Sequence, residues 1–178
     1  MILLAFGIVL FTVLHLIPAL PQVKARLKAQ IGDRLYGPVY GSISLVALVL
    51  IFLGWRASPF IPVYEPFWWG RYFNFATMFL AFQCFAIFLF RGHLRQRLRF
   101  PMGIAVLLWG TGHLFANGDL AGFILFGGMM IYAALHIAFG IAQGARPSPL
   151  VHNGHDLLAF MAGLALYGVM TQVHALWL

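Results

Sequence analysis

Three histidines lie inside long apolar runs of this 178-residue sequence, and their imidazoles are the side chains best suited to chemistry. They are His15, His113 and His136. An ionisable side chain at membrane depth is costly, so each must meet a partner in the protein, a cofactor or a water-filled cavity. The other four histidines lie in polar loops or near the end of the last run, where water or headgroups can satisfy them; they are His93, His152, His155 and His174.

The depth of two of these rings in the membrane follows from the helical rise. At about 1.5 Å per residue, His15 lies roughly 20 Å, and His113 roughly 18 Å, from the start of its run. The two runs cross in opposite directions, so both rings are expected in the middle half of a hydrocarbon core about 30 Å thick. We expect His136 deeper, toward the cytoplasm.

Two imidazoles from different helices at mid-membrane depth could be the axial ligands of a b-type haem. His15 and His113 are the candidate iron ligands, and His136 is a reserve ligand or a neighbour of the cofactor. Hydrogen bonds across helices are the alternative use of the same side chains. Zinc fits less well, because no acidic residue or second cysteine is placed to complete its ligand set.

Small side chains surround His113 along its run; they are Gly103, Gly110, Gly112 and Ala116. They could let a flat macrocycle approach the helix, or they could serve ordinary close packing between helices. Near the other candidate, Pro18 follows His15 by three residues and cannot donate a hydrogen bond to the carbonyl of Leu14. We therefore expect a kink beside His15.

Composition sets the class of protein. The chain is 62% hydrophobic and 8% charged, which is too apolar for a soluble domain of this size. Runs of about 20 residues predict an all-α, polytopic transmembrane bundle of about six spans rather than a barrel of short strands. The expected spans are Ile2–Leu20, Gly37–Trp55, Trp68–Phe90, Pro101–Asn117, Leu120–Ala142 and Leu157–Leu178. We expect one domain over residues 1–178, with the first run retained as a helix.

The positions of the basic residues predict how the chain crosses the membrane. With the N-terminus outside, nine of the 11 Lys and Arg residues fall in cytoplasmic loops and only Arg56 and Arg71 fall outside. A bacterial inner membrane is the expected location. Because the basic residues cluster between apolar runs, we expect the lipid bilayer, and not nucleic acid, as the partner of the +7 chain.

Two shorter features each allow more than one interpretation. The basic segment after Pro21 suits a helix lying on an anionic membrane surface, or equally a solvated loop. Cys84 is the only cysteine, which excludes an intramolecular disulfide, and its position within a span favours an inert buried thiol.

Several motifs resemble the bacterial NnrU family across nearly the whole chain. F-x-x-x-H-L-I-P-A-L-P spans Phe11 to Pro21, R-x-P-M begins at Arg99, and W-x-x-x-H-L-x-A-N-G begins at Trp109. Tyr36 and Tyr40 resemble the aromatic pair at the entry to that family's second helix. The resemblance implies a polytopic membrane protein associated with nitric oxide and nitrite metabolism in denitrifying bacteria.

The NnrU family is also similar to the plant 15-cis-zeta-carotene isomerase, which holds a b-type haem between histidines. By that resemblance, the haem ligands match His15 and His113, and an H-x-x-F-G stretch matches His136 to Gly140. The chain departs from these patterns at Phe100, where the family usually has histidine, and at Gly110, where the plant enzyme has cysteine. A thiolate ligand switch at Gly110 is therefore excluded.

Three functions follow as hypotheses. The first is a haem protein that binds nitric oxide or passes one electron. The second is an enzyme, a haem-dependent cis–trans isomerase of a lipophilic, carotenoid-like polyene. The third is a non-catalytic assembly partner in the membrane, which would have no cofactor and no need of His15 or His113. The sequence does not identify a protein partner for any of them.

Overall fold

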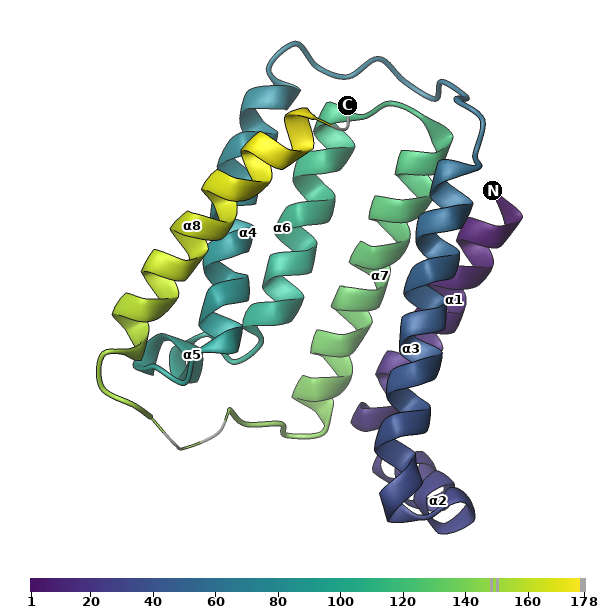
Figure 1. Cartoon of the computed structure of the whole chain (residues 1–178), viewed down its shortest axis with the longest axis vertical. Helices are drawn as coiled ribbons and strands as arrows, with labels where there is room; N and C mark the ends of the chain where they lie inside the picture. The colour runs from purple at the N-terminus through teal and green to yellow at the C-terminus, as the bar shows by residue number, and fades with distance from the viewer. Residues whose placement is uncertain (148, 150, 177–178) are drawn as a thin grey trace. The chain divides into compact units, whose positions relative to one another are not determined.

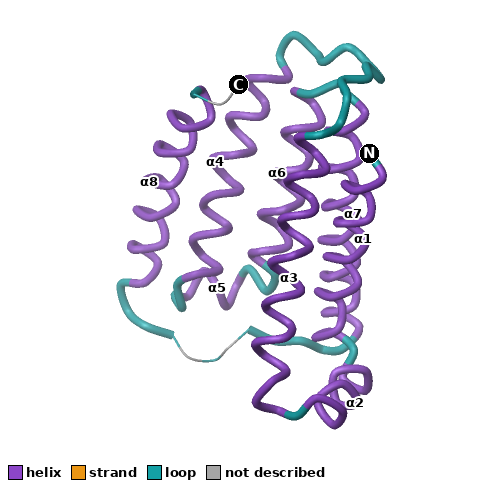
Figure 2. The backbone as a smooth tube through the Cα atoms, turned by 45° about the vertical axis from the view of Figure 1, so that its right-hand side comes forward, coloured by secondary structure: helices purple, strands orange, loops and turns teal. Residues whose placement is uncertain are grey.

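The computed structural model describes residues 1–147, 149 and 151–176, and these form helices joined by loops (Figures 1 and 2). The described part of the chain holds no strand beyond an isolated antiparallel bridge between Pro62 and Asp119. The elements in order are α1 (Ile2–Leu16), the 3-10 helix η1 (Ile17–Ala19), α2 (Pro21–Ile31), α3 (Asp33–Arg56), α4 (Gly70–Leu89), α5 (His93–Arg97), α6 (Pro101–Ala116), α7 (Leu120–Ala142) and α8 (His155–Ala175).

Five segments of the described chain are long and apolar enough to cross a membrane, which confirms the predicted all-α, multi-pass class. They are Ile2–Ala19, Asp33–Arg56, Gly70–Leu89, Leu120–Ala142 and His155–His174. The sixth expected span, α6, is apolar but shorter, with 16 residues. Large hydrophobic side chains are widely exposed along these helices, as lipid-facing surfaces require.

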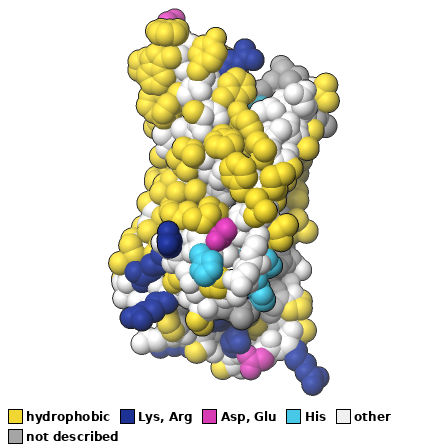
Figure 3. Space-filling view, turned by 90° about the vertical axis from the view of Figure 1, so that its left-hand side faces the viewer, with side chains coloured by type: hydrophobic (Ala, Val, Ile, Leu, Met, Phe, Trp, Pro, Cys, Tyr) yellow, Lys and Arg dark blue, Asp and Glu magenta, His cyan; other side chains and the backbone are white. Residues whose placement is uncertain are grey.

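The face that carries α8 shows the same division between lipid-like and polar surface. In Figure 3, hydrophobic side chains cover most of the upper part of this face, whereas Lys, Arg and His side chains gather toward its lower part. Within the second unit, the connection at the start of α8 is polar, and Asp156 there accepts hydrogen bonds from the backbone of α5.

The helices group into two compact units. The first unit is Met1–Glu65 with Asn117–Gln143, and the second is Pro66–Ala116 with Gly144–Leu178. Each unit is therefore built from chain segments far apart in the sequence. The expectation of one domain over the whole chain stays a prediction.

In the first unit, α1 packs against α3 and α7 (Figure 1). Leu4 of α1 is fully buried, and Gly54 of α3 brings its backbone against the backbone of Leu4. Gly7 lies in the same way against Ile51. Glycine at these crossings lets the two backbones approach closely, which is how helices associate where lipid removes the hydrophobic driving force.

In the second unit, α4 packs against both α6 and α8 (Figure 2). A Cβ atom at Gly70 would strike the carbonyl of Phe115, and one at Gly163 would lie 2.8 Å from the Gln83 side chain. These contacts join α4 to α6 and to α8, respectively. The second unit is thus held together through α4.

Three connections differ from, or sharpen, what the sequence predicts. The segment after Pro21 is a helix, α2, with no buried residue, and its contact with a membrane stays a prediction. The basic stretch after α4, expected as a loop, contains the short helix α5. Asp156 holds the start of this helix: its carboxylate accepts hydrogen bonds from the backbone N–H groups of His93 and Leu94 at 3.1 and 3.0 Å. The proline-rich segment between α3 and α4 is irregular, as expected.

Candidate functional site

His113 lies in the last turn of α6 and is 8% exposed. Its Nδ1 atom is 2.8 Å from the carbonyl oxygen of Trp109, one turn earlier. Because a carbonyl only accepts hydrogen bonds, Nδ1 is the donor in this contact. The preceding residue, Gly112, faces Thr77 and Asn74 of α4, so the backbone of α6 is fixed next to the histidine.

His15 lies in the last turn of α1 and is partly buried. Its Nδ1 atom is 2.9 Å from the carbonyl oxygen of Phe11, and the Phe11 ring stacks on the imidazole with centroids 3.8 Å apart. The rings of Tyr40 and Tyr132 approach to 5.7 and 5.8 Å. An aromatic cage from α1, α3 and α7 therefore surrounds His15 inside the first unit.

The helix changes type directly after His15. The α-helix ends at Leu16, directly after His15, and continues as the 3-10 turn Ile17–Ala19 that contains Pro18. Proline cannot donate to the carbonyl one turn earlier, and the tighter turn accommodates that loss. His15 therefore lies at the end of the regular α-helix, and the kink beside it stays a prediction.

The two histidines have the same local arrangement. Each follows an aromatic residue by four positions, and its Nδ1 atom faces the carbonyl oxygen of that residue. A hydrogen bond of this kind from the far ring nitrogen is the usual support of a metal-binding histidine, because it fixes both the tautomer and the ring orientation. Both side chains therefore suit axial ligation of a haem iron through Nε2. The porphyrin would supply the equatorial nitrogens, so the protein need add only axial ligands.

His136 belongs to the first unit, on α7, one turn after Tyr132. The two rings have centroids 5.9 Å apart, and Tyr132 also contacts His15. The buried Nδ1 of His136 has no hydrogen-bond partner among the described residues. The structure thus brings together two of the three histidines predicted from the sequence, His136 and His15, on either side of Tyr132.

His113 and His15 belong to different units, so their pairing on one iron stays a prediction. Within the second unit, the described ring neighbours of His113 include His174, a histidine that the sequence leaves to water or headgroups. The two rings have centroids 6.2 Å apart and planes at 89°. A sequence signal for this neighbour exists: both residues lie in the last turns of helices expected to cross the membrane in the same direction.

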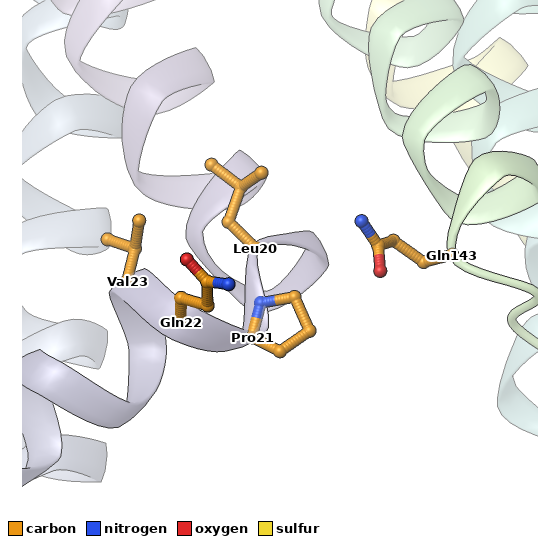
Figure 4. Close-up of a pocket in the computed structure, with 5 residues that line it drawn as sticks. All are labelled: Leu20, Pro21, Gln22, Val23 and Gln143. Carbon is orange, nitrogen blue, oxygen red and sulfur yellow. The ribbon is translucent and has the colours of Figure 1, made fainter.

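Other potential sites offer fewer ligands. Within the described residues, no group of three or more His, Cys, Asp or Glu side chains lies close enough together to hold a metal ion. A cavity of about 390 Å³ opens where α1 meets α2, lined by Leu20, Pro21, Gln22, Val23 and Gln143. Figure 4 shows the amide of Gln143, at the end of α7, directed toward the Leu20–Val23 segment. This lining carries amides and apolar groups, which suit no redox or acid–base chemistry.

Together, the apolar spans and the supported histidines within them define a multi-pass helical membrane protein with a candidate cofactor site. The family model described as NnrU protein matches residues 3–178, nearly the whole chain. The chain belongs to the NnrU family. No curated protein and no solved structure matches it.

Proposed function

We propose that this NnrU-family protein binds a b-type haem within the membrane and acts in nitric oxide or nitrite metabolism. His15 and His113 are the proposed axial ligands, and His136 is a neighbour of the cofactor. The observation that carries the proposal is the shared support of both rings, in which Nδ1 faces the carbonyl one turn earlier at 2.9 and 2.8 Å. The nitrogen-oxide role rests on family membership.

When bound, a haem would supply reversible one-electron chemistry and an iron that binds diatomic gases. The residues of this chain would do the rest. The carbonyls of Phe11 and Trp109 hold the protons on Nδ1 and so keep Nε2 of each histidine as a ligand atom. Burial of His113, and the stack of Phe11 on His15, restrict water at the ligating rings.

Absorption spectroscopy of the purified, full-length protein tests the proposal. Protein expressed with a haem precursor, or titrated with hemin in detergent, should show a Soret band and sharp visible bands on reduction. His113→Ala should lose or strongly weaken these bands, whereas His93→Ala, on the exposed helix α5, is the matched control and should keep them. A wild-type protein without a Soret band after hemin titration would overturn the proposal.

The nitrogen-oxide role has its own measurement. Addition of nitric oxide to the reduced, haem-loaded protein should shift the Soret band, because a bound haem would supply an iron that binds diatomic gases. A haem-loaded protein whose spectrum does not respond to nitric oxide would contradict gas binding.

A further inference from the structure

We propose that the connection between α4 and α6 binds the phosphate group of an anionic phospholipid. The side chains that carry this inference are the four arginines of the connection, Arg91, Arg95, Arg97 and Arg99. They lie on and around the short helix α5, in the second unit. The inference is independent of haem binding.

The arginines of this connection have no carboxylate to neutralise them within the part of the chain that the structure describes. There, the only ion pair joins Lys28 to Asp33, in the first unit. Asp156 contacts the connection, but both of its carboxylate oxygens already accept hydrogen bonds from the backbone N–H groups of His93 and Leu94. The positive charge is therefore left for an anion from outside the chain.

Hydrogen bonds to the segment that enters α8 hold the backbone of the connection in place. The N–H of Arg91 donates to Nδ1 of His155 at 3.2 Å, and its carbonyl accepts from the N–H of His152 at 2.9 Å. Farther along, Nε2 of Gln96 donates to the carbonyl of Pro149 at 3.0 Å. Because this backbone is already ordered, a bound phosphate does not have to order it, and that lowers the cost of binding.

Two of the arginines lie over aromatic rings. The guanidinium carbon of Arg95 is 5.2 Å from the ring centroid of Phe88, in the last turn of α4, and that of Arg99 is 5.1 Å from the ring centroid of Phe100. Arg99 also donates from Nε to the carbonyl of Ala145. Contact with a ring uses the face of a guanidinium group, whereas its N–H groups lie in the plane. The terminal nitrogens can therefore still donate to phosphate oxygens.

Exposed apolar side chains beside the connection favour a lipid over a free anion. Phe88 and Leu89 end α4 and are 37% and 53% exposed, and Leu157 and Leu158 in the first turn of α8 are 66% and 51% exposed. Both helices are long and apolar enough to cross a membrane. A phospholipid with its phosphate at the arginines would lay its acyl chains along these helices, whereas inorganic phosphate has no group that uses them.

Native mass spectrometry of the purified, full-length protein in detergent tests the inference. Dioleoyl-phosphatidylglycerol is the probe, and dioleoyl-phosphatidylcholine, whose headgroup has no net charge, is the comparison lipid. Wild type should bind phosphatidylglycerol more tightly. Arg91→Gln with Arg97→Gln removes two exposed charges and should weaken phosphatidylglycerol binding about 30-fold, with little change for phosphatidylcholine.

Two further variants serve as controls. Arg56→Gln with Arg71→Gln removes the same charge from two exposed arginines outside the connection and should bind phosphatidylglycerol like wild type. Arg91→Lys with Arg97→Lys keeps both charges and should keep most of the binding, which separates a loss of charge from a change of fold.

Three results would count against the phospholipid site. The first is equal affinity of wild type for the two lipids. The second is an equal loss of binding in Arg91→Gln with Arg97→Gln and in the Arg56 and Arg71 control, which would show an effect of net charge alone. The third is a lysine variant that binds as weakly as the glutamine variant. None of these results bears on haem, so the proposed function would stand or fall by its own spectra.

Discussion

Gly112→Ala probes the packing that positions His113, and its effect can be worked out from the structure. A Cβ atom at residue 112 would overlap the hydroxyl of Thr77 and lie 2.5 Å from the side-chain oxygen of Asn74. Thr77 does not yield easily. Thr77 is 5% exposed, and its hydroxyl donates to the carbonyls of Phe73 and Asn74, at 3.1 and 3.0 Å.

The expected loss of stability combines two opposing effects. Overpacking a well-packed site costs about 1–3 kcal/mol. Alanine recovers about 0.5–1 kcal/mol over glycine in a helix interior. Taking the middle of the first range, about 2 kcal/mol, the net loss is about 1–1.5 kcal/mol, which lowers the melting temperature of a chain this long by roughly 2–6 °C.

Thermal unfolding in detergent, followed by tryptophan fluorescence, measures this change. Gly168→Ala is the matched control, because Gly168 lies in α8 of the same unit and a Cβ there meets nothing within 4 Å. The control should melt at or slightly above the wild-type temperature. If Gly112→Ala melts at or above the wild-type temperature, the close approach of α4 and α6 described here is wrong.

Three further predictions concern the ends of helices and the surface of α2. Asp119→Ala removes the N-cap of α7, whose carboxylate accepts from the N–H of Gly122 at 3.0 Å, and should cost about 1 kcal/mol in a denaturant titration; an unchanged midpoint would contradict the cap. Asp156→Ala leaves two backbone donors of α5 without their acceptor and should raise amide hydrogen exchange in α5. Asn153→Ala is the control and should leave the exchange unchanged. Equal exchange in the two variants would refute the stabilisation of α5 by Asp156. The basic side chains of exposed α2 should attract anionic headgroups, so the protein should be more thermally stable in phosphatidylglycerol than in phosphatidylcholine nanodiscs. Lys24→Gln with Arg26→Gln should reduce this difference in melting temperature. An unchanged difference would favour a solvated helix.

The spans were largely predictable because apolar length dominates membrane sequences. The bounds of α7 match the prediction at both ends, since Asn117-Gly118-Asp119 marks its start and Asp119 supplies a capping side chain. The start of α3 was predicted four residues too late. The helix begins at Asp33, whose carboxylate pairs with Lys28 at 2.7 Å, and it continues through Pro38. A proline this close to the start of a helix removes only one of its hydrogen bonds, and the helix continues.

The candidate site was predictable only in part. The positions of His15 and His113 inside apolar runs identify them, because burial of an imidazole in a membrane helix requires a reason. The hydrogen bond from each ring is also local, because its acceptor is the carbonyl four residues earlier in the same helix, at Phe11 or Trp109. The proximity of His174 to His113 depends on how α6 and α8 each pack on α4, which no single run encodes.

The most direct test of the account is the haem content of the protein purified from the membranes in which it is made. A pyridine haemochrome assay against total protein should give about one haem b per chain for wild type and for His93→Ala, and a ratio near zero for the double variant His15→Ala with His113→Ala. A wild-type ratio near zero under haem-replete growth, or an unchanged ratio in the double variant, would contradict a haem held by these histidines.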